Sequence, residues 1–413
     1  MIPVKEARDI ILSRVAVLGT ERVELFAALG RVLAEDVIAP FDVPPHKNSA
    51  MDGYAARSAD LRGATPETPV TLTVIEDLPA GYVSAKTLGA GQAIRIMTGA
   101  PMPNGADAVI RVEDTRRGDG AQVMILRERP PHFDVRFAGE DLRRGAVAIP
   151  KGKILRPAEI GLFASLGRSF ALVYQRPRVA ILSTGDELAE VDEPLLPGKI
   201  FNANAYSLAA QTLECGAIPT LLGIARDAKA DLDAKFAQAA RADLILSSGG
   251  VSAGDYDFVK DLLRQTGSEM RFWQVCMKPG KPFAFGSIGG TPVFGLPGNP
   301  VSSMVSFEVF ARPALLKMMG HAAIFRASVT AQLTHDFKKD DDRKHFARVT
   351  LERRGGEFLA TSTGAQGSGI LASMSKADGF AVIDEPRMFI SAGERVPVMV
   401  LDNSLLMTPE REF

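Results

Sequence analysis

The segment from Leu246 to Lys260, LSSGGVSAGDYDFVK, has the residue types of a phosphate site followed by those of a cation site. Glycines let a backbone approach a phosphate that a side chain would keep away. The N–H groups at a helix start favour the same ligand, because they form the helix's positive end. Asp255 and Asp257 follow, and carboxylates beside a phosphate are expected where a hard cation such as Mg²⁺ lies between them.

Two further segments, STGDEL (183–188) and LPGNPVSS (296–303), have a similar composition and also follow apolar, strand-like runs. Ligands of open α/β sheets bind at the carboxyl ends of the strands, so we predict that the three loops form one crevice. Asp186 and Glu187 would add two carboxylates to it. The alternatives are ordinary turns, a helix cap at Asp255 and solvated surface acids.

The sequence lacks the motifs of several other nucleotide-binding and metal sites. The sequence has no GxxxxGK[ST] and no GxGxxG after a strand, which argues against a Walker loop and a dinucleotide fingerprint. It has no HExxH or CxxC, and its five histidines are scattered, which argues against zinc. MKPGKPFAFG (277–286) is either a rigid turn with two solvated lysines or, beside the crevice, a source of point charges for an oxyanion. In HKNSAMDGYAA (46–56), Asp52-Gly53 by itself reads as a turn.

The elements that must position the loops alternate between strand and helix from Arg178 to Gly320, which predicts a largely parallel sheet. We expect Asn202 or Asn204 to cap the first helix, which would end near Gly216. The expected strands are 178–183, 218–224, 243–248 and 292–297, and the expected helices are 202–213, 230–242, 255–265 and 302–319.

The flanking regions have different patterns. Apolar spacing predicts a helix over 4–17. After Arg326 no helical pattern is seen, and we expect a small β-barrel or sandwich. The expected strands are 70–75, 93–97, 108–112 and 122–126 in the N-terminal part, and 327–333, 345–354, 357–363, 379–384 and 394–401 in the C-terminal part.

Bulk composition narrows the function classes. Among 413 residues, 48 lysines and arginines nearly balance 49 acids, so no net field favours nucleic acid or an anionic membrane. The charged start, MIPVKEARDI, is unlike a signal peptide, and no apolar run approaches the ~20 residues of a membrane span. Two cysteines, Cys215 and Cys276, do not form a disulfide framework. We expect a soluble cytoplasmic protein.

Taken together, eight segments resemble the molybdopterin molybdenumtransferases, the MoeA family, which includes the E domain of gephyrin. They follow the family order through nearly the whole chain, so chance agreement is negligible. The segments are NSAMDGYA (48–55), RIMTGAPMPNGADAVIRVED (95–114), AGEDLRRG (138–145), ILSTGDEL (181–188), SSGGVSAGDYDFVK (247–260), MKPGKPFAFG (277–286), GLPGNPVSS (295–303) and GSGILASMSKADGF (367–380).

The resemblance implies a multidomain α/β plus β fold in an elongated homodimer. A doubly wound, mostly parallel α/β domain related to molybdopterin adenylyltransferase would follow an N-terminal helical and linking domain with an inserted β domain, and a small β-barrel would end the chain. The implied ranges are 1–44 with 138–174 for the linking domain, 45–137 for the inserted domain, 175–322 for the α/β domain and 323–413 for the barrel.

The implied reaction is the insertion of molybdenum from molybdate into adenylated molybdopterin, with Mg²⁺-dependent release of AMP. The sulfur ligands belong to the pterin, and molybdate, a dianion, needs lysine, arginine, hydroxyl and backbone donors. The implied partners are a second copy of the chain, the molybdopterin adenylyltransferase and the molybdoenzymes that accept the cofactor.

Roles follow by position. Asp52 and Thr98 would reach the crevice of the partner subunit. The implied catalytic residues are Asp52, Thr98, Asp141, Glu187, Asp227, Asp257 and Lys278, and the implied metal ligands are Asp186, Glu187 and Asp257. The implied substrate-binding residues are Ser248, Gly249, Gly250, Ser252, Gly254, Lys281, Pro297, Asn299, Ser302, Arg343, Arg348 and Ser368.

One departure from the family pattern is Gln274, which stands where some relatives have a lysine. It affects the detail of anion binding and leaves the reaction class in place. Two other functions stay open. The adenylyltransferase shares the α/β domain but typically stands alone, and a scaffold or carrier would bind ligand without releasing AMP.

Overall fold

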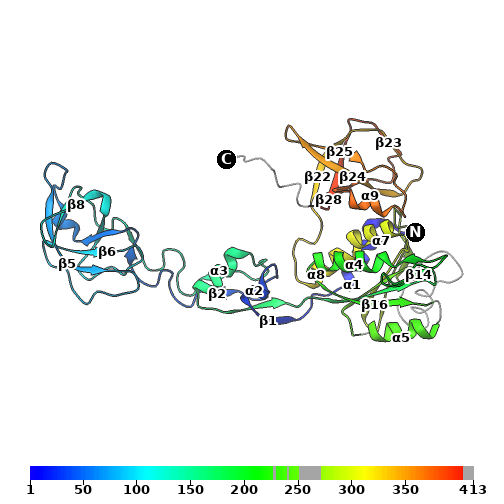
Figure 1. Ribbon diagram of the computed structural model, residues 1–413, viewed down its shortest axis with the longest axis horizontal. Helices are drawn as coiled ribbons and strands as arrows, with labels where there is room; N and C mark the ends of the chain where they lie inside the picture. The colour runs from blue at the N-terminus through cyan, green and yellow to red at the C-terminus, as the bar shows by residue number, and fades with distance from the viewer. Residues whose placement is uncertain (227–228, 240, 251–270, 403–413) are drawn as a thin grey trace. The chain divides into compact units, whose positions relative to one another are not determined.

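The computed structural model describes residues 1–226, 229–239, 241–250 and 271–402 (Figure 1). The described chain divides into two compact units. The first unit contains residues 1–23, 27–34 and 172–413, and the second contains residues 24–26 and 35–171. The finer domain boundaries expected from the sequence stay predictions. None of the described helices is long and apolar enough to cross a bilayer.

The first unit is built around a six-stranded sheet in the order β16-β13-β17-β21-β20-β18. The first four strands pair in parallel, β20 pairs antiparallel with β21, and the edge strand β18 pairs antiparallel with β20. This confirms the largely parallel sheet. The strands are β13 (Arg178–Thr184), β16 (Ile218–Ala225), β17 (Leu244–Ser248), β18 (Phe272–Gln274), β20 (Pro282–Ile288) and β21 (Thr291–Leu296).

Helices cover both faces of this sheet (Figure 1). Val179 and Ile181 of β13 pack in one core cluster with α1, α4, α7 and α8, whereas Ala180 and Leu182 pack in another with α5. The alternation follows from the period of two in a strand, so a sheet covered on both faces requires apolar residues at both sets of positions. The helices are α1 (Val4–Arg14), α4 (Ala203–Glu214), α5 (Lys229–Ala239), α7 (Pro300–Ser306) and α8 (Arg312–Met318).

Several predicted elements differ from the structure. The first helix ends at Arg14 rather than at 17, because Val15 is already extended. The single helix expected over 302–319 is α7, a π-helical turn (Phe307–Ala311) and α8. Pro313 has no N–H to donate to the preceding turn, which accounts for the interruption. The helix expected over 255–265 lies outside the described residues.

The C-terminal part of the first unit forms a closed barrel, which confirms one of the two folds expected there. The five strands pair in the cycle β24-β25-β22-β28-β26-β24, around a core that includes Val349, Ala360 and Val398. The absence of helix predicted here is wrong, because α9 (Leu371–Ser375) follows the turn after β25. The strands are β22 (Ser328–Leu333), β24 (Lys344–Arg354), β25 (Glu357–Ser362), β26 (Gly379–Ile383) and β28 (Arg395–Val400), with the short pair β23 (Phe337–Lys338) and β27 (Phe389–Ile390).

Short strand pairings connect further segments of the chain. β19 (Met277–Lys278) lies parallel to β24, which ties the MKPGKP segment to the barrel. β14 (Leu188–Ala189) pairs with β15 (Ile200–Phe201) beyond the end of β13. β1 (Thr20–Glu24) pairs with β12 (Phe170–Tyr174), and α2 (Leu25–Ala28) spans the division between the units.

The second unit contains a six-stranded sheet in the order β7-β4-β6-β5-β9-β8, which includes all four strands expected before residue 130. Gly53 opens β4 and is not part of a turn. A Cβ there would lie 1.9 Å from the carbonyl oxygen of Ile110, so only glycine allows β4 to lie this close to β7. The strands are β4 (Gly53–Ala56), β5 (Val70–Leu78), β6 (Gln92–Ile96), β7 (Ala108–Arg111), β8 (Thr115–Arg117) and β9 (Gln122–Ile125).

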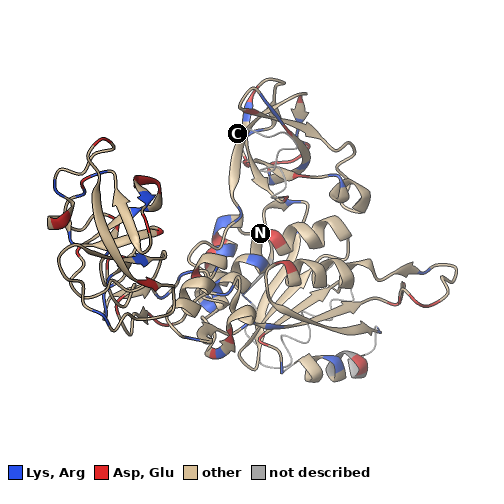
Figure 2. Cartoon of the chain, turned by 60° about the vertical axis from the view of Figure 1, so that its left-hand side comes forward, with Lys and Arg blue, Asp and Glu red and all other residues tan. Residues whose placement is uncertain are grey.

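The second unit also contains two short strand pairs, a helix, and two 3-10 helices at Ser58–Leu61 and Val112–Asp114. The strand pairs and the α-helix are β2 (Val37–Ile38) with β11 (Val147–Ile149), β3 (Asn48–Ser49) with β10 (Val135–Arg136), and α3 (Pro157–Ser165). In Figure 2, basic and acidic residues are interspersed along the elements of each unit, in keeping with the nearly balanced charge of the sequence.

Candidate functional site

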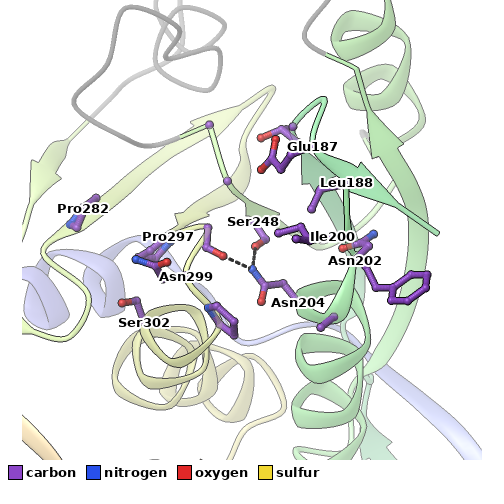
Figure 3. Close-up of a pocket in the computed structure, with 18 residues that line it drawn as sticks. Glu187, Leu188, Ile200, Asn202, Asn204, Ser248, Pro282, Pro297, Asn299 and Ser302 are labelled. Carbon is purple, nitrogen blue, oxygen red and sulfur yellow. Dashed lines mark hydrogen bonds between the residues drawn. The ribbon is translucent and has the colours of Figure 1, made fainter. Parts of the chain in front are cut away.

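The carboxyl ends of β13, β17 and β21 meet at one cavity of about 480 Å³ in the first unit (Figure 3). Register explains the meeting, because Ser248 pairs with Ser183 on one side and with Leu296 on the other. Residues of all three predicted loops line the cavity, so the predicted crevice exists. The lining residues are Thr184, Gly185, Glu187, Leu188, Ile200, Phe201, Asn202, Ala203, Asn204, Ser248, Gly249, Gly250, Pro282, Pro297, Gly298, Asn299, Pro300 and Ser302.

The polar lining is mostly neutral. Among the described residues no lysine or arginine lines the cavity, and Glu187 is the one ionisable side chain that does. The hydroxyl of Thr184, which lines the cavity, is buried without a hydrogen-bond partner in the described chain. An anionic ligand here would therefore be held by hydroxyl, amide and backbone donors, with a cation supplied from solution or from elsewhere.

Gly249 allows the loop after β17 to lie against the end of β13. Its φ is +89°, and a Cβ would lie 2.6 Å from the carbonyl oxygen of Thr184. Its N–H donates to the carbonyl oxygen of Leu296 (3.1 Å). Gly249 therefore shapes the cavity, and its N–H is not one of the donors available to a phosphate.

The helix after β15 settles which asparagine is the cap. Asn202 precedes α4, and its Oδ1 accepts from the N–H of Ala205 (3.4 Å) and from the Ser183 hydroxyl (2.7 Å). Asn204 instead turns its carboxamide toward the cavity loops: its Nδ2 donates to Ser248 Oγ (2.8 Å) and to the Gly298 carbonyl oxygen (2.7 Å). The sequence prediction included Asn204 only as a possible cap, since polar residues at a helix start usually have that role.

The C-terminal barrel contributes contacts at the PGNP loop. Asn299 Nδ2 donates to Ser368 Oγ (3.0 Å), and the Val301 N–H donates to the Ser368 carbonyl oxygen (3.0 Å). Arg348 is fully buried, and its Nη2 donates to the carbonyl oxygens of Ala365 and Gly367 (3.1 Å each). Its Nε and Nη1 have no partner in the described chain, and burial lowers the pKa of its guanidinium.

The lysines of MKPGKP lie elsewhere. Lys278 Nζ is 2.5 Å from Asp340 Oδ1 and 3.6 Å from Asp341 Oδ2, because β19 pairs with the barrel strand β24. Lys281 is exposed and does not line the cavity. Arg343 also pairs with Asp341 (2.5 Å). The structure thus differs from the expected placing of both lysines in the crevice.

The same acids form a small cluster with a histidine. Ligand atoms of Asp340, Asp341 and His345 lie within 4.8 Å of one another. The neighbouring cations Lys278 and Arg343 already pair with these carboxylates, so the cluster is accounted for by ion pairs.

Asp341 should make the barrel sensitive to acid. Burial disfavours the ionised carboxylate, but hydrogen bonds from Arg343 and His345 outweigh it and hold the pKa of Asp341 below its ordinary value of 3.8. A depressed pKa stabilises the fold above the unfolded value and loses that effect as the pH falls through 3.8 and below. We expect Asp341→Asn to melt below the wild type at pH 7, with the gap starting to narrow only as the pH falls below 3.8. A gap that is independent of pH in thermal melts would contradict this.

Four other predicted site residues lie among the described residues: Asp186, Asp52, Thr98 and Asp141. Asp186 is exposed and does not line the cavity, and its carbonyl oxygen accepts from Lys199. In the second unit, Asp52 Oδ1 accepts from the N–H and the hydroxyl of Thr98 (2.7 Å each). These hydrogen bonds, the backbone one first, lower the pKa of Asp52. Asp141 of that unit is exposed. Asp227, Ser252, Gly254 and Asp257 lie outside the described residues.

Three family descriptions match this chain in order. Residues 2–167 match the MoeA N-terminal region (domain I and II), residues 180–317 a probable molybdopterin binding domain, and residues 330–401 the MoeA C-terminal region (domain IV).

Individual relatives match over nearly the full length. Molybdopterin molybdenumtransferase 2 of Mycobacterium tuberculosis is 40% identical over 96% of this chain and 99% of its own. Molybdopterin molybdenumtransferase of Nostoc is 38% identical over 97% of this chain and 94% of its own. The crystal structure of the molybdopterin biosynthesis MoeA protein of Pyrococcus horikoshii superposes with a TM-score of 0.82 at 33% identity, covering 97% of this chain and 100% of that one.

Proposed function

The chain belongs to the MoeA family of molybdopterin molybdenumtransferases, and on that premise we propose that it transfers molybdenum from molybdate to adenylated molybdopterin and releases AMP. The observation that carries the proposal is the cavity at which three strand ends meet. Its hydroxyl and amide donors suit phosphate oxygens. Leu188, Ile200 and Phe201 add an apolar wall that suits a flat heterocycle.

The residues present fit a magnesium ion. Mg²⁺ is usually bound by one or two carboxylates together with substrate phosphates and water, and Glu187 lines the cavity beside the phosphate donors. Of the three predicted ligands, Glu187 is the one among the described residues that lines the cavity, and it would hold the ion together with Asp257, which lies outside the described residues. When bound, it would neutralise charge on the pyrophosphate. Ser248, Asn299 and Ser302 would orient the phosphates. Ser368 and the buried Arg348 are outside the cavity lining, but Ser368 is hydrogen-bonded to Asn299 and Arg348 to the neighbouring Gly367, and these two would supply donors for molybdate.

The test is AMP release from adenylated molybdopterin by the purified chain with Mg²⁺, with and without molybdate. Molybdate-stimulated release supports the transferase. Binding without release would contradict it and favour a carrier, and turnover of ATP with molybdopterin would favour the adenylyltransferase.

A composite site in a homodimer gives a second prediction. If Asp52 of one subunit completes the cavity of the other, Asp52→Asn and Glu187→Gln should each be inactive alone. Co-expressed, half the dimers are mixed, and each mixed dimer has one site with both wild-type residues. We therefore expect activity to return to about a quarter of the wild-type value. If both residues acted in one chain, every mixed site would lack one of them and the mixture would stay inactive.

A cytoplasmic location and the protein partners stay predictions.

A further inference from the structure

Asn204 joins helix α4 to two of the three loops that form the cavity. Its Nδ2 donates to Ser248 Oγ (2.8 Å), at the end of β17, and to the carbonyl oxygen of Gly298 (2.7 Å), in the PGNP loop (Figure 3). It lines the cavity itself and is not the cap of α4, which is Asn202. Its side chain is therefore not used as a helix cap and can organise the cavity.

The chemistry of the carboxamide fixes the direction of the hydrogen bond to Ser248. A carboxamide nitrogen has two N–H groups and is only a donor, and here both groups are used. Ser248 Oγ must then accept, which leaves its own proton for another acceptor. The side chain is buried, with 2% of the residue exposed, and its hydroxyl makes no other hydrogen bond within the described chain. An anionic oxygen in the cavity would satisfy it.

We propose that Asn204 is a positioning residue with two effects. It makes Ser248 a hydrogen-bond donor to a phosphate oxygen of the nucleotide, and its second hydrogen bond, to Gly298, holds the PGNP loop beside the end of β17. The identity of the ligand rests on the proposed function. The direction of the hydrogen bond rests only on the contacts of Asn204.

Asn204→Asp reverses the polarity of this contact with almost no change in shape. A carboxylate would accept the Ser248 proton, so the hydroxyl would no longer donate to a phosphate, and it would repel the Gly298 carbonyl oxygen. The variant loses a hydrogen bond to a charged phosphate oxygen, and such a bond contributes substantially to the free energy of binding. We therefore expect the dissociation constant of AMP, measured by calorimetry, to rise about 30-fold or more. Asn204→Ala removes the donor without adding an acceptor, and a rise of about fivefold is expected.

A double-mutant cycle separates positioning from general loosening. If Asn204 acts through Ser248, adding Asn204→Asp to Ser248→Ala should weaken AMP binding far less than it does in the wild type. Additive losses would overturn the proposal, and so would unchanged binding by Asn204→Asp. Ser207→Ala is the matched control, because it removes a hydrogen bond to the carbonyl oxygen of Asn204 (3.1 Å) and leaves the carboxamide intact. It should bind AMP as the wild type does.

The outcomes distinguish this inference from the proposed function. A wild-type chain that binds AMP but releases none from adenylated molybdopterin would refute the transferase and leave the role of Asn204 standing. A wild-type chain that turns over substrate, yet binds neither AMP nor pyrophosphate, would overturn the role of Asn204 instead.

Discussion

Replacing Arg348 by methionine is expected to lower molybdate-stimulated AMP release by about a hundredfold or more, with the barrel still folded. Arg348 is fully buried in β24, and the described chain supplies no carboxylate to pair with it. Two of its three guanidinium nitrogens have no hydrogen-bond partner among the described residues. A buried cation in this state is costly, and an anion that supplies the missing acceptors would bind strongly.

The stability of this variant should change little. Methionine fills a similar volume and removes an unpaired buried charge, which favours the fold. Against this, the carbonyl oxygens of Ala365 and Gly367 lose their donor, at about 1–3 kcal/mol. We expect the two effects to offset within about 2 kcal/mol in urea unfolding.

The matched control is Arg353→Met, an exposed arginine of the same strand, which should change neither turnover nor stability. The informative measurement is the dependence of AMP release on molybdate concentration. Near-normal molybdate dependence in Arg348→Met would show that the guanidinium is a structural charge and not part of the oxyanion site.

Periodicity was enough to predict the crevice. Apolar runs such as RVAILS and DLILSS indicate buried parallel strands, and parallel strands bring the loops that follow them to one edge. Glu187, Ser248 and Asn299 could be predicted on this ground, and they line the cavity.

What the sequence could not indicate are contacts that depend on a distant partner. The position of Lys278 is determined by Asp340 and Asp341, more than 60 residues along the chain, and no local pattern encodes that pairing. The contacts of Asn204 could not be predicted for another reason. A polar residue in the first turn of a helix has a local explanation as a cap, so its contacts with Ser248 and Gly298 become visible only once the sheet register is known.

Gly249→Ala is the second large effect, and here we expect a loss of stability together with activity. The backbone at this position has a φ of +89°, which costs an L-residue about 1 kcal/mol. The added Cβ would also lie 2.6 Å from the Thr184 carbonyl oxygen and 2.9 Å from its hydroxyl, and Thr184 belongs to a buried strand that cannot move freely. Overpacking of this kind adds about 1–3 kcal/mol, and relieving it must separate two of the loops that form the cavity.

Gly290→Ala separates the cost of overpacking from the cost of the positive φ. Gly290 has nearly the same φ, +88°, in the turn between β20 and β21, but a Cβ there meets no atom within 4 Å. It should lose only about 1 kcal/mol and keep full AMP affinity. If Gly249→Ala unfolds at the same urea concentration as Gly290→Ala and binds AMP normally, the close approach of the β17 loop to β13 is not required. A larger loss at Gly249 alone would show that the cavity depends on the absence of one methyl group.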